Sequence, residues 1–147
     1  MPASTAAKLY TPNLLSLATE LAAFPLSGDW QVQGNSRSTT CGSSLTVGIN
    51  LTDEDAIAEL GLGVSACAVG QAAAALFARS ATGARLTSIN LVLAQIEAWM
   101  EDPSAPEPDW PDFQALSAAR ELKGRHGAIL LPWKAAQQAL CKVPDTR

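Results

Sequence analysis

Residues 45–51 read Leu-Thr-Val-Gly-Ile-Asn-Leu, so apolar residues alternate with polar or small ones. A period of two predicts a β-strand with one buried face, because successive side chains point to opposite sides of a strand. The polar stretch at 52–55 predicts a turn, and the alternation resumes at 58–64, where Ala58 opens the apolar series. A shorter alternating segment lies at 29–34. Short polar connections favour antiparallel pairing, so we predict a three-stranded antiparallel meander.

Before and after these strands, apolar residues recur at helical spacing and predict helices. Ser65 is the expected N-cap of the helix after the third strand, which places Cys67 near the second position of that helix. Unpaired backbone N–H groups stabilise negative charge in such a first turn. Because strands and helices are segregated along the chain, we expect an α+β fold: a small three-stranded antiparallel sheet with helices packed on one face. The predicted helices cover about 11–23, 65–81, 87–100, 113–122 and 126–142.

Length and composition indicate one folded unit. The chain has 147 residues, of which 48% are hydrophobic and 16% charged. This balance is typical of a globular protein and not of a disordered one. We expect a single domain over 1–147, with a loose tail at 1–9 and an exposed proline-rich loop at 101–112.

Charge and apolar patterning exclude several classes of function. The net charge is −4 and the basic residues are scattered along the sequence, which gives no support to nucleic-acid binding. No apolar run reaches the roughly 18 residues that a membrane helix needs. The N-terminus lacks the pattern of a signal peptide. Three cysteines are too few for a disulfide framework, so we expect a cytoplasmic protein with reduced thiols and no membrane partner.

Two of the three cysteines fall at junctions between predicted elements. Cys41 stands in Cys-Gly-Ser before the second strand, and Cys67 stands in Ser-Ala-Cys-Ala where the third strand meets a helix. Folding can bring such thiols together, where they could take up sulfur, bind a metal or form a disulfide. The alternative is that each is a small packing residue. Cys141, at the end of the last helix, is expected to be structural or merely exposed.

The order of these elements and three short motifs resemble a known family. The motifs are Cys-Gly-Ser at 41–43, Cys67 at the opening of a helix, and Arg-His-Gly-Ala-Ile-Leu-Leu-Pro-Trp-Lys at 125–134. Over residues 10–141 the chain resembles iron–sulfur cluster assembly scaffolds of the IscU/NifU N-terminal type. Its long insert at 100–122 is similar to that of the SufU-like branch. The resemblance implies the same SufE/NifU-like α+β fold.

Several positions depart from that family's usual pattern. Ser43 stands in place of the aspartate of the family's Cys-Gly-Asp, and the family's third cysteine falls on Ala128. Gly127 stands where the family has lysine or histidine. His126 lies one position from the usual histidine, and Arg125 matches the family's arginine. The resemblance therefore implies an incomplete ligand set.

By this resemblance the chain handles sulfur, zinc or an iron–sulfur cluster and is not an enzyme. Cys67 is the expected sulfur-accepting thiol, and Cys41 with Cys67 is the expected pair for binding sulfur or a cluster. Cys41, Cys67 and His126 offer three metal ligands, one fewer than a closed tetrahedral zinc site or a cluster requires. The implied partners are a cysteine desulfurase and apo-protein acceptors.

Two alternatives remain open. The residues at 43, 127 and 128 favour a divergent member that has lost metal and sulfur chemistry and acts as a binding or interaction module. A thiol–disulfide redox protein is a weaker alternative, because the sequence contains no Cys-x-x-Cys pair.

Overall fold

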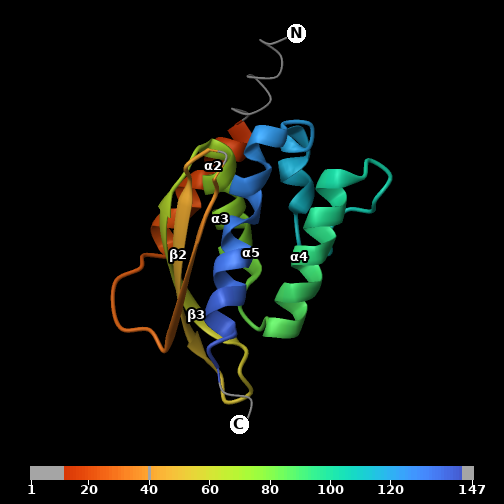
Figure 1. Cartoon of the computed structure of the whole chain (residues 1–147). Helices are drawn as coiled ribbons and strands as arrows, with labels where there is room; N and C mark the ends of the chain where they lie inside the picture. Colours follow the sequence, from red (N-terminus) through yellow and green to blue (C-terminus); the bar gives the residue numbers. More distant parts are fainter. Residues whose placement is uncertain (1–11, 40, 144–147) are drawn as a thin grey trace.

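A three-stranded antiparallel sheet forms one layer of the protein (Figure 1). The computed structural model describes residues 12–39 and 41–143. Strands β1 (Val32–Arg37), β2 (Ser44–Leu51) and β3 (Ile57–Ser65) lie in the order β1-β2-β3, each antiparallel to the next. The predicted meander and the α+β fold are confirmed.

The register of the sheet changes once, and this corrects one predicted core position. Leu45, Val47 and Ile49 are buried, as the alternation predicts. A bulge at Asn50/Leu51 then pairs Leu51 with Ile57. The extra residue turns Ile57 toward the core and leaves Ala58 exposed, so the prediction that Ala58 belongs to the buried series is wrong.

The helices differ from the predicted ones mainly at their ends. The tail predicted at 1–9 and the first residue of the helix predicted at 11–23 lie outside the described residues. The first helix tightens to 3₁₀ geometry at Glu20, and the short helix predicted at 113–122 is 3₁₀ throughout. None of the described helices has the length and apolar character to cross a bilayer. The elements are α2 (Pro12–Thr19), η1 (Glu20–Ala23), α3 (Ala68–Ser80), α4 (Leu86–Glu101), η2 (Phe113–Ala119), η3 (Lys123–Arg125) and α5 (His126–Leu140).

Helix α5 packs directly on the sheet, and α4 lies beyond it (Figure 1). The two backbones approach each other closely at Gly34, where a Cβ atom would overlap the Ala135 carbonyl oxygen and come within 2.6 Å of the Ala139 nitrogen. Only glycine lets strand and helix backbones meet at this distance. Gly34 therefore sets the separation between α5 and β1.

The opposite face of the sheet is covered by the segment between η1 and β1. The Trp30 ring lies over Gly48 and Gly61, at positions where Cβ atoms would overlap the indole. Trp30 Nε1 donates a hydrogen bond to the Leu26 carbonyl at 3.0 Å. Because Trp30 packs over the face of the sheet, it is not part of a strand. Strand β1 therefore begins at Val32, three residues later than predicted.

Both edges of the sheet are occupied by other parts of the chain. On β1, the Asn35 N–H donates to Gln138 Oε1 at 2.7 Å, and Lys142 Nζ donates to the Gln33 carbonyl at 2.6 Å. On β3, the Leu62 N–H donates to a carbonyl of the segment after η1 at 2.8 Å. These bonds satisfy backbone groups that an edge strand would otherwise expose.

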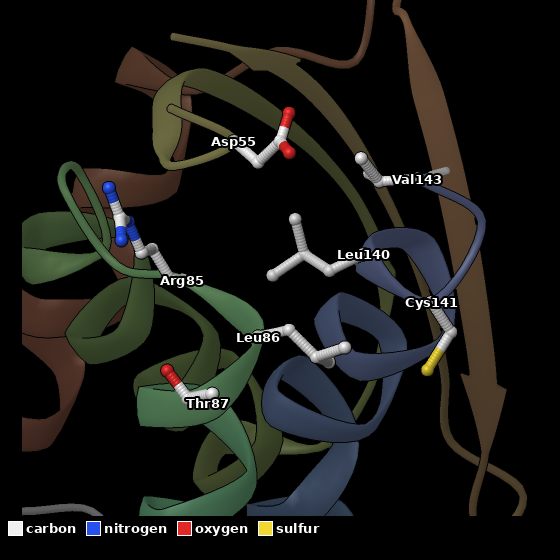
Figure 2. A pocket seen from close by; sticks show the side chains of 7 residues that line it. All are labelled: Asp55, Arg85, Leu86, Thr87, Leu140, Cys141 and Val143. Carbon is white, nitrogen blue, oxygen red and sulfur yellow. The ribbon is translucent and has the colours of Figure 1, made fainter. Parts of the chain in front are cut away.

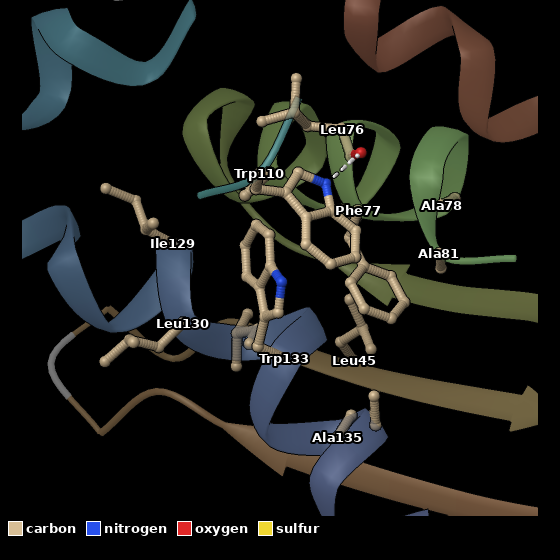
Figure 3. Close-up of a cluster of buried hydrophobic side chains, with 14 of the residues drawn as sticks. Leu45, Leu76, Phe77, Ala78, Ala81, Trp110, Ile129, Leu130, Trp133 and Ala135 are labelled. Carbon is tan, nitrogen blue, oxygen red and sulfur yellow. Dashed lines mark hydrogen bonds between the residues drawn. The ribbon is translucent and has the colours of Figure 1, made fainter. Parts of the chain in front are cut away.

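An aromatic cluster fills the core between α3 and α5 (Figure 3). The Trp110 and Phe77 rings stack with centroids 5.5 Å apart, and the Trp133 ring meets the Trp110 ring edge-on at 5.4 Å. Trp110 Nε1 donates to the Leu76 carbonyl at 3.0 Å. Residues 102–112 contain no helix or strand, yet Trp110 is 8% exposed. That tryptophan attaches the insert to the core.

Candidate thiol site

Cys41 and Cys67 line one shallow pocket of about 250 Å³ at one end of the sheet. Strand pairing produces this proximity, because Ser44 and Ser65 are partners at the end of the β2–β3 ladder. Cys41 lies three residues before the first of them, and Cys67 lies two residues after the second. Gly42, Ser43, Ser65 and Ala66 complete the pocket. The fold thus places two thiols that are distant in sequence on one surface.

A tight turn positions Cys41. The Ser38 N–H donates to the Ser43 carbonyl at 2.8 Å, and the Gly42 N–H donates to the Ser38 carbonyl at 3.0 Å. Gly42 has a φ of 71°, a left-handed conformation that glycine adopts without strain. The turn closes the chain between β1 and β2 and leaves the Cys41 side chain half-exposed.

Two buried hydroxyl groups contact the sulfur atom of Cys41. Its Sγ lies 3.4 Å from Ser38 Oγ and 3.1 Å from Ser43 Oγ. Both serines are 4% exposed. The side-chain hydrogen bonds between Cys41 and the two serines, Ser38 first and then Ser43, hold the pKa of the Cys41 thiol below its ordinary value. A backbone hydrogen bond from Ser43 and the positive charge of Arg125 add to this effect, while partial burial opposes it.

Cys67 occupies the N-cap position of α3, and not the second helical position predicted from the sequence. Strand β3 continues through Ser65, which remains paired with Ser44, so Ser65 cannot cap the helix. Cys67 has extended backbone angles, φ −66° and ψ 174°, and its carbonyl accepts the hydrogen bond from the Gln71 N–H at 2.9 Å. Its side chain makes no cap hydrogen bond and is half-exposed. The sulfur of Cys67 is therefore accessible.

His126 lies in a separate pocket beside the thiols. It is the first residue of α5 and lines a cavity of about 220 Å³ to which Ser38 also contributes. Its Nε2 is 2.6 Å from the Arg120 carbonyl oxygen. A carbonyl oxygen only accepts, so Nε2 must carry the hydrogen, and this atom is not available to a metal. Residues 12–39 and 41–143 contain no group of three His, Cys, Asp or Glu side chains placed to hold a metal ion.

Ala128 stands where the resemblance places a third cysteine. Ala128 is 0% exposed in the first turn of α5. A Cβ atom built at Gly70 would lie 3.3 Å from that of Ala128, so the first turns of α3 and α5 are in contact there. Cys67 caps the same turn of α3. Cys41 and Cys67 alone are too few protein ligands for zinc or a [2Fe–2S] cluster, and within residues 12–39 and 41–143 no further His, Cys, Asp or Glu completes a group of three with them.

Ser38 is a site residue that the sequence did not reveal. It lies outside the Cys-Gly-Ser motif and has no chemical signature of its own. Its hydroxyl meets Cys41 only because the turn closes onto the end of β1. The resemblance drew attention to Ser43 as a lost aspartate, whereas the structure shows its hydroxyl in contact with sulfur.

Cys141 belongs to a different region of the protein. It is exposed just after α5 and lines a cavity of about 530 Å³ together with Asp55, Arg85 and Leu140 (Figure 2). Helix α5 has 15 residues, so its two ends lie about 22 Å apart. Cys141 is therefore too far from the opening turn of α5 to join the pair at Cys41 and Cys67.

Solved structures share this fold. The N-terminal part of a nitrogen-fixing NifU-like protein from Brucella abortus matches with a TM-score of 0.84 at 22% identity, over 97% of this chain and 99% of that chain. A proposed iron–sulfur cluster assembly scaffold protein for the SUF system (a SufU) from Fervidobacterium islandicum matches with a TM-score of 0.78 at 16% identity, over 91% of this chain and 98% of that chain. No family model and no curated protein matches the sequence. The comparisons establish a NifU-like fold and confirm the predicted structural resemblance.

Proposed function

We propose that this chain is a sulfur-acceptor protein of the iron–sulfur cluster assembly type. The observation that carries the proposal is the Cys41 thiol, half-exposed and in contact with two buried hydroxyl groups, in a pocket shared with Cys67. The thiolate is the nucleophilic form of cysteine, and hydrogen bonds to it increase its population at neutral pH. The NifU-like fold supplies the context of sulfur handling.

The proposed reaction is a transfer of sulfane sulfur. The Cys41 thiolate attacks the terminal sulfur of a persulfide on a donor protein. A sulfur–sulfur bond forms at Cys41, the sulfur–sulfur bond of the donor breaks, and the donor leaves as a thiolate. The proton of the transferred sulfhydryl stays with it, so no external oxidant or reductant is needed.

The two cysteines have different parts in this proposal. Sequence analysis gave the accepting role to Cys67, and we assign the first attack to Cys41 because the two serine contacts are at its sulfur. Cys67 lies beside it as a second thiol for onward transfer. The proposal includes no resident zinc or cluster, and His126 is not a ligand in it.

The resemblance in fold is also the basis for inferring the partner proteins. We infer a cysteine desulfurase as the persulfide donor and apo-proteins as the final acceptors, in a cytoplasm that keeps the thiols reduced. In this role the chain is a carrier and not an enzyme, since its own thiol is consumed in each transfer and restored only by a partner.

Sulfur transfer from a cysteine desulfurase tests the proposal. After incubation with the desulfurase and L-cysteine, we expect the Cys41 peptide to gain the mass of one sulfur atom. Cys41→Ser should abolish the addition of sulfur to peptides from the N-terminal half of the chain in the first seconds. Cys141→Ser should leave this addition unchanged, because Cys141 lies at the far end of α5. Mass spectrometry of peptides from alkylated, unreduced protein gives the measurement.

The same assay separates the proposal from an interaction module without sulfur chemistry. A wild-type chain that stays unlabelled while a known acceptor in the same tube is labelled would reject the sulfur-acceptor function. That alternative is favoured by the buried Ala128, which stands where the resemblance places a third cysteine ligand.

Restoring a thiol at position 128 should create a metal site. Ala128 contacts the turn of α3 that Cys67 caps, so Ala128→Cys adds a third sulfur near the shared pocket. We expect the variant to bind about one zinc per chain, with three thiolates and a water as ligands, and the unmodified chain to bind far less. Zinc is measured by elemental analysis after dialysis.

Ala136→Cys is the matched control for this substitution. Ala136 is also a fully buried alanine of α5, two turns further along the helix. Zinc uptake by both variants, or by neither in correctly folded protein, would contradict the placement of the missing ligand at position 128.

A further inference from the structure

A pocket beside the thiol site is lined by basic side chains. It has a volume of about 220 Å³ and lies between the end of β1 and the start of α5. Arg37 comes from β1, Lys123 from η3 and Lys134 from α5, and all three are exposed. Ser38 lines the same pocket while its hydroxyl contacts Cys41. The basic pocket and the thiol site therefore share a wall.

Basic side chains elsewhere in the described residues have partners. Arg79 pairs with Glu20 and Asp112, and Arg85 pairs with a carboxylate at 2.8 Å. Arg120 and Lys142 donate to backbone carbonyl oxygens. Their positive charges are used within the fold.

The side chains at the pocket have no such partners. Within residues 12–39 and 41–143, no carboxylate oxygen lies within 4.0 Å of the charged groups of Arg37, Lys123 or Lys134, and none of these groups donates a hydrogen bond. The charge of Arg125, the residue before α5, acts on Cys41. The unpaired cations of the described chain are thus concentrated at one place, next to the thiol.

This local charge has the opposite sign to the protein as a whole. The chain carries a net charge of −4, which repels long polyanions such as nucleic acids. A confined positive pocket on an acidic protein instead favours a short run of carboxylates, which three flexible cations can bind without competition from internal ion pairs.

We propose that this basic pocket docks an acidic segment of the protein that exchanges sulfur at Cys41. The docked segment would lie against Ser38 and thereby bring its protein up to the thiol. The sulfur-exchange role of the partner rests on the proposed function, whereas the binding of an acidic segment does not.

Binding of a synthetic hexaglutamate peptide tests the pocket directly. In NMR titrations of the isotope-labelled full chain at low salt, we expect shifts at Arg37, Gly127 and Lys134. The double variant Lys123→Glu/Lys134→Glu should weaken binding at least tenfold, and raising the salt concentration should weaken binding to the wild type. Arg85→Gln removes one exposed positive charge near the far end of α5 and should leave the affinity unchanged.

Three outcomes would overturn the proposal. They are equal binding of hexaglutamine, unchanged affinity in the double variant, and inorganic phosphate at the same concentration producing the same shifts, which would indicate a small-anion site. Sulfur transfer to Cys41 from a small-molecule persulfide is measured in parallel. If the wild-type chain binds the peptide but accepts no sulfur, the sulfur-acceptor function alone is rejected. If it accepts sulfur but does not bind the peptide, the docking pocket alone is rejected.

Discussion

Gly34→Ala is expected to lower the free energy of unfolding by about 3 kcal/mol or more. The added methyl group would occupy the space of the Ala135 carbonyl oxygen and of the Ala139 nitrogen, which are backbone atoms of α5. A side chain could rotate away, but a helix backbone moves only if the whole helix shifts. Such a shift would disturb the contacts of α5 with both β1 and β2. Urea unfolding followed by circular dichroism gives the measurement.

Gly124→Ala is the control for this substitution. Gly124 lies in η3, and a Cβ atom there would meet no heavy atom within 4 Å. We expect a change within about 0.5 kcal/mol. If Gly34→Ala unfolded at the same urea concentration as Gly124→Ala, then α5 would not approach β1 at backbone distance.

The second large effect concerns the reactivity of Cys41. Contacts with Ser38 and Ser43 lower the pKa of this thiol, so the fraction of thiolate at neutral pH is raised. Removing both hydroxyl groups in Ser38→Ala/Ser43→Ala should raise the pKa and move the midpoint of the alkylation-rate profile to higher pH. Because a hydrogen bond to a charged group contributes about 1.5–3 kcal/mol, alkylation at neutral pH should slow by about tenfold or more.

The rate profile itself shows whether the serines act through the thiolate. Iodoacetamide labelling of the Cys41 peptide is measured from acidic to alkaline pH. Well above the midpoint, the double variant and the wild type should react at similar rates, because both are then fully ionised. Ser65→Ala is the control, since Ser65 lines the same pocket and makes no hydrogen bond to the sulfur. A uniform slowing at every pH would instead indicate altered access to Cys41.

The sheet could be predicted from sequence because its signal is local. Alternation at 45–51 reports directly which side of β2 is buried, and Leu45, Val47 and Ile49 are buried as expected. The last helix was also predicted, over about 126–142, and α5 covers His126–Leu140. The strand limits were not predictable at Trp30, whose ring covers glycines that are far away in sequence.

The thiol site was predictable only in part. The junction positions of Cys41 and Cys67 are visible in the sequence, and they lie in one pocket. The contribution of Ser38 depends on the closure of a turn, and the separate position of His126 depends on its bond to the Arg120 carbonyl. The cluster of unpaired cations could not be predicted from the sequence either, because only the packing of β1 against α5 brings Arg37 and Lys134 together.

The occupied margins of the sheet restrict how other proteins can associate with this one. Three backbone groups on these edge strands already have partners: the Gln33 carbonyl and the Asn35 N–H on β1, and the Leu62 N–H on β3. A visiting polypeptide could extend the ladder only by displacing these native bonds, so β-augmentation is disfavoured. Partner proteins are then expected to bind through surface side chains. The same bonded edges also oppose edge-to-edge aggregation at high protein concentration.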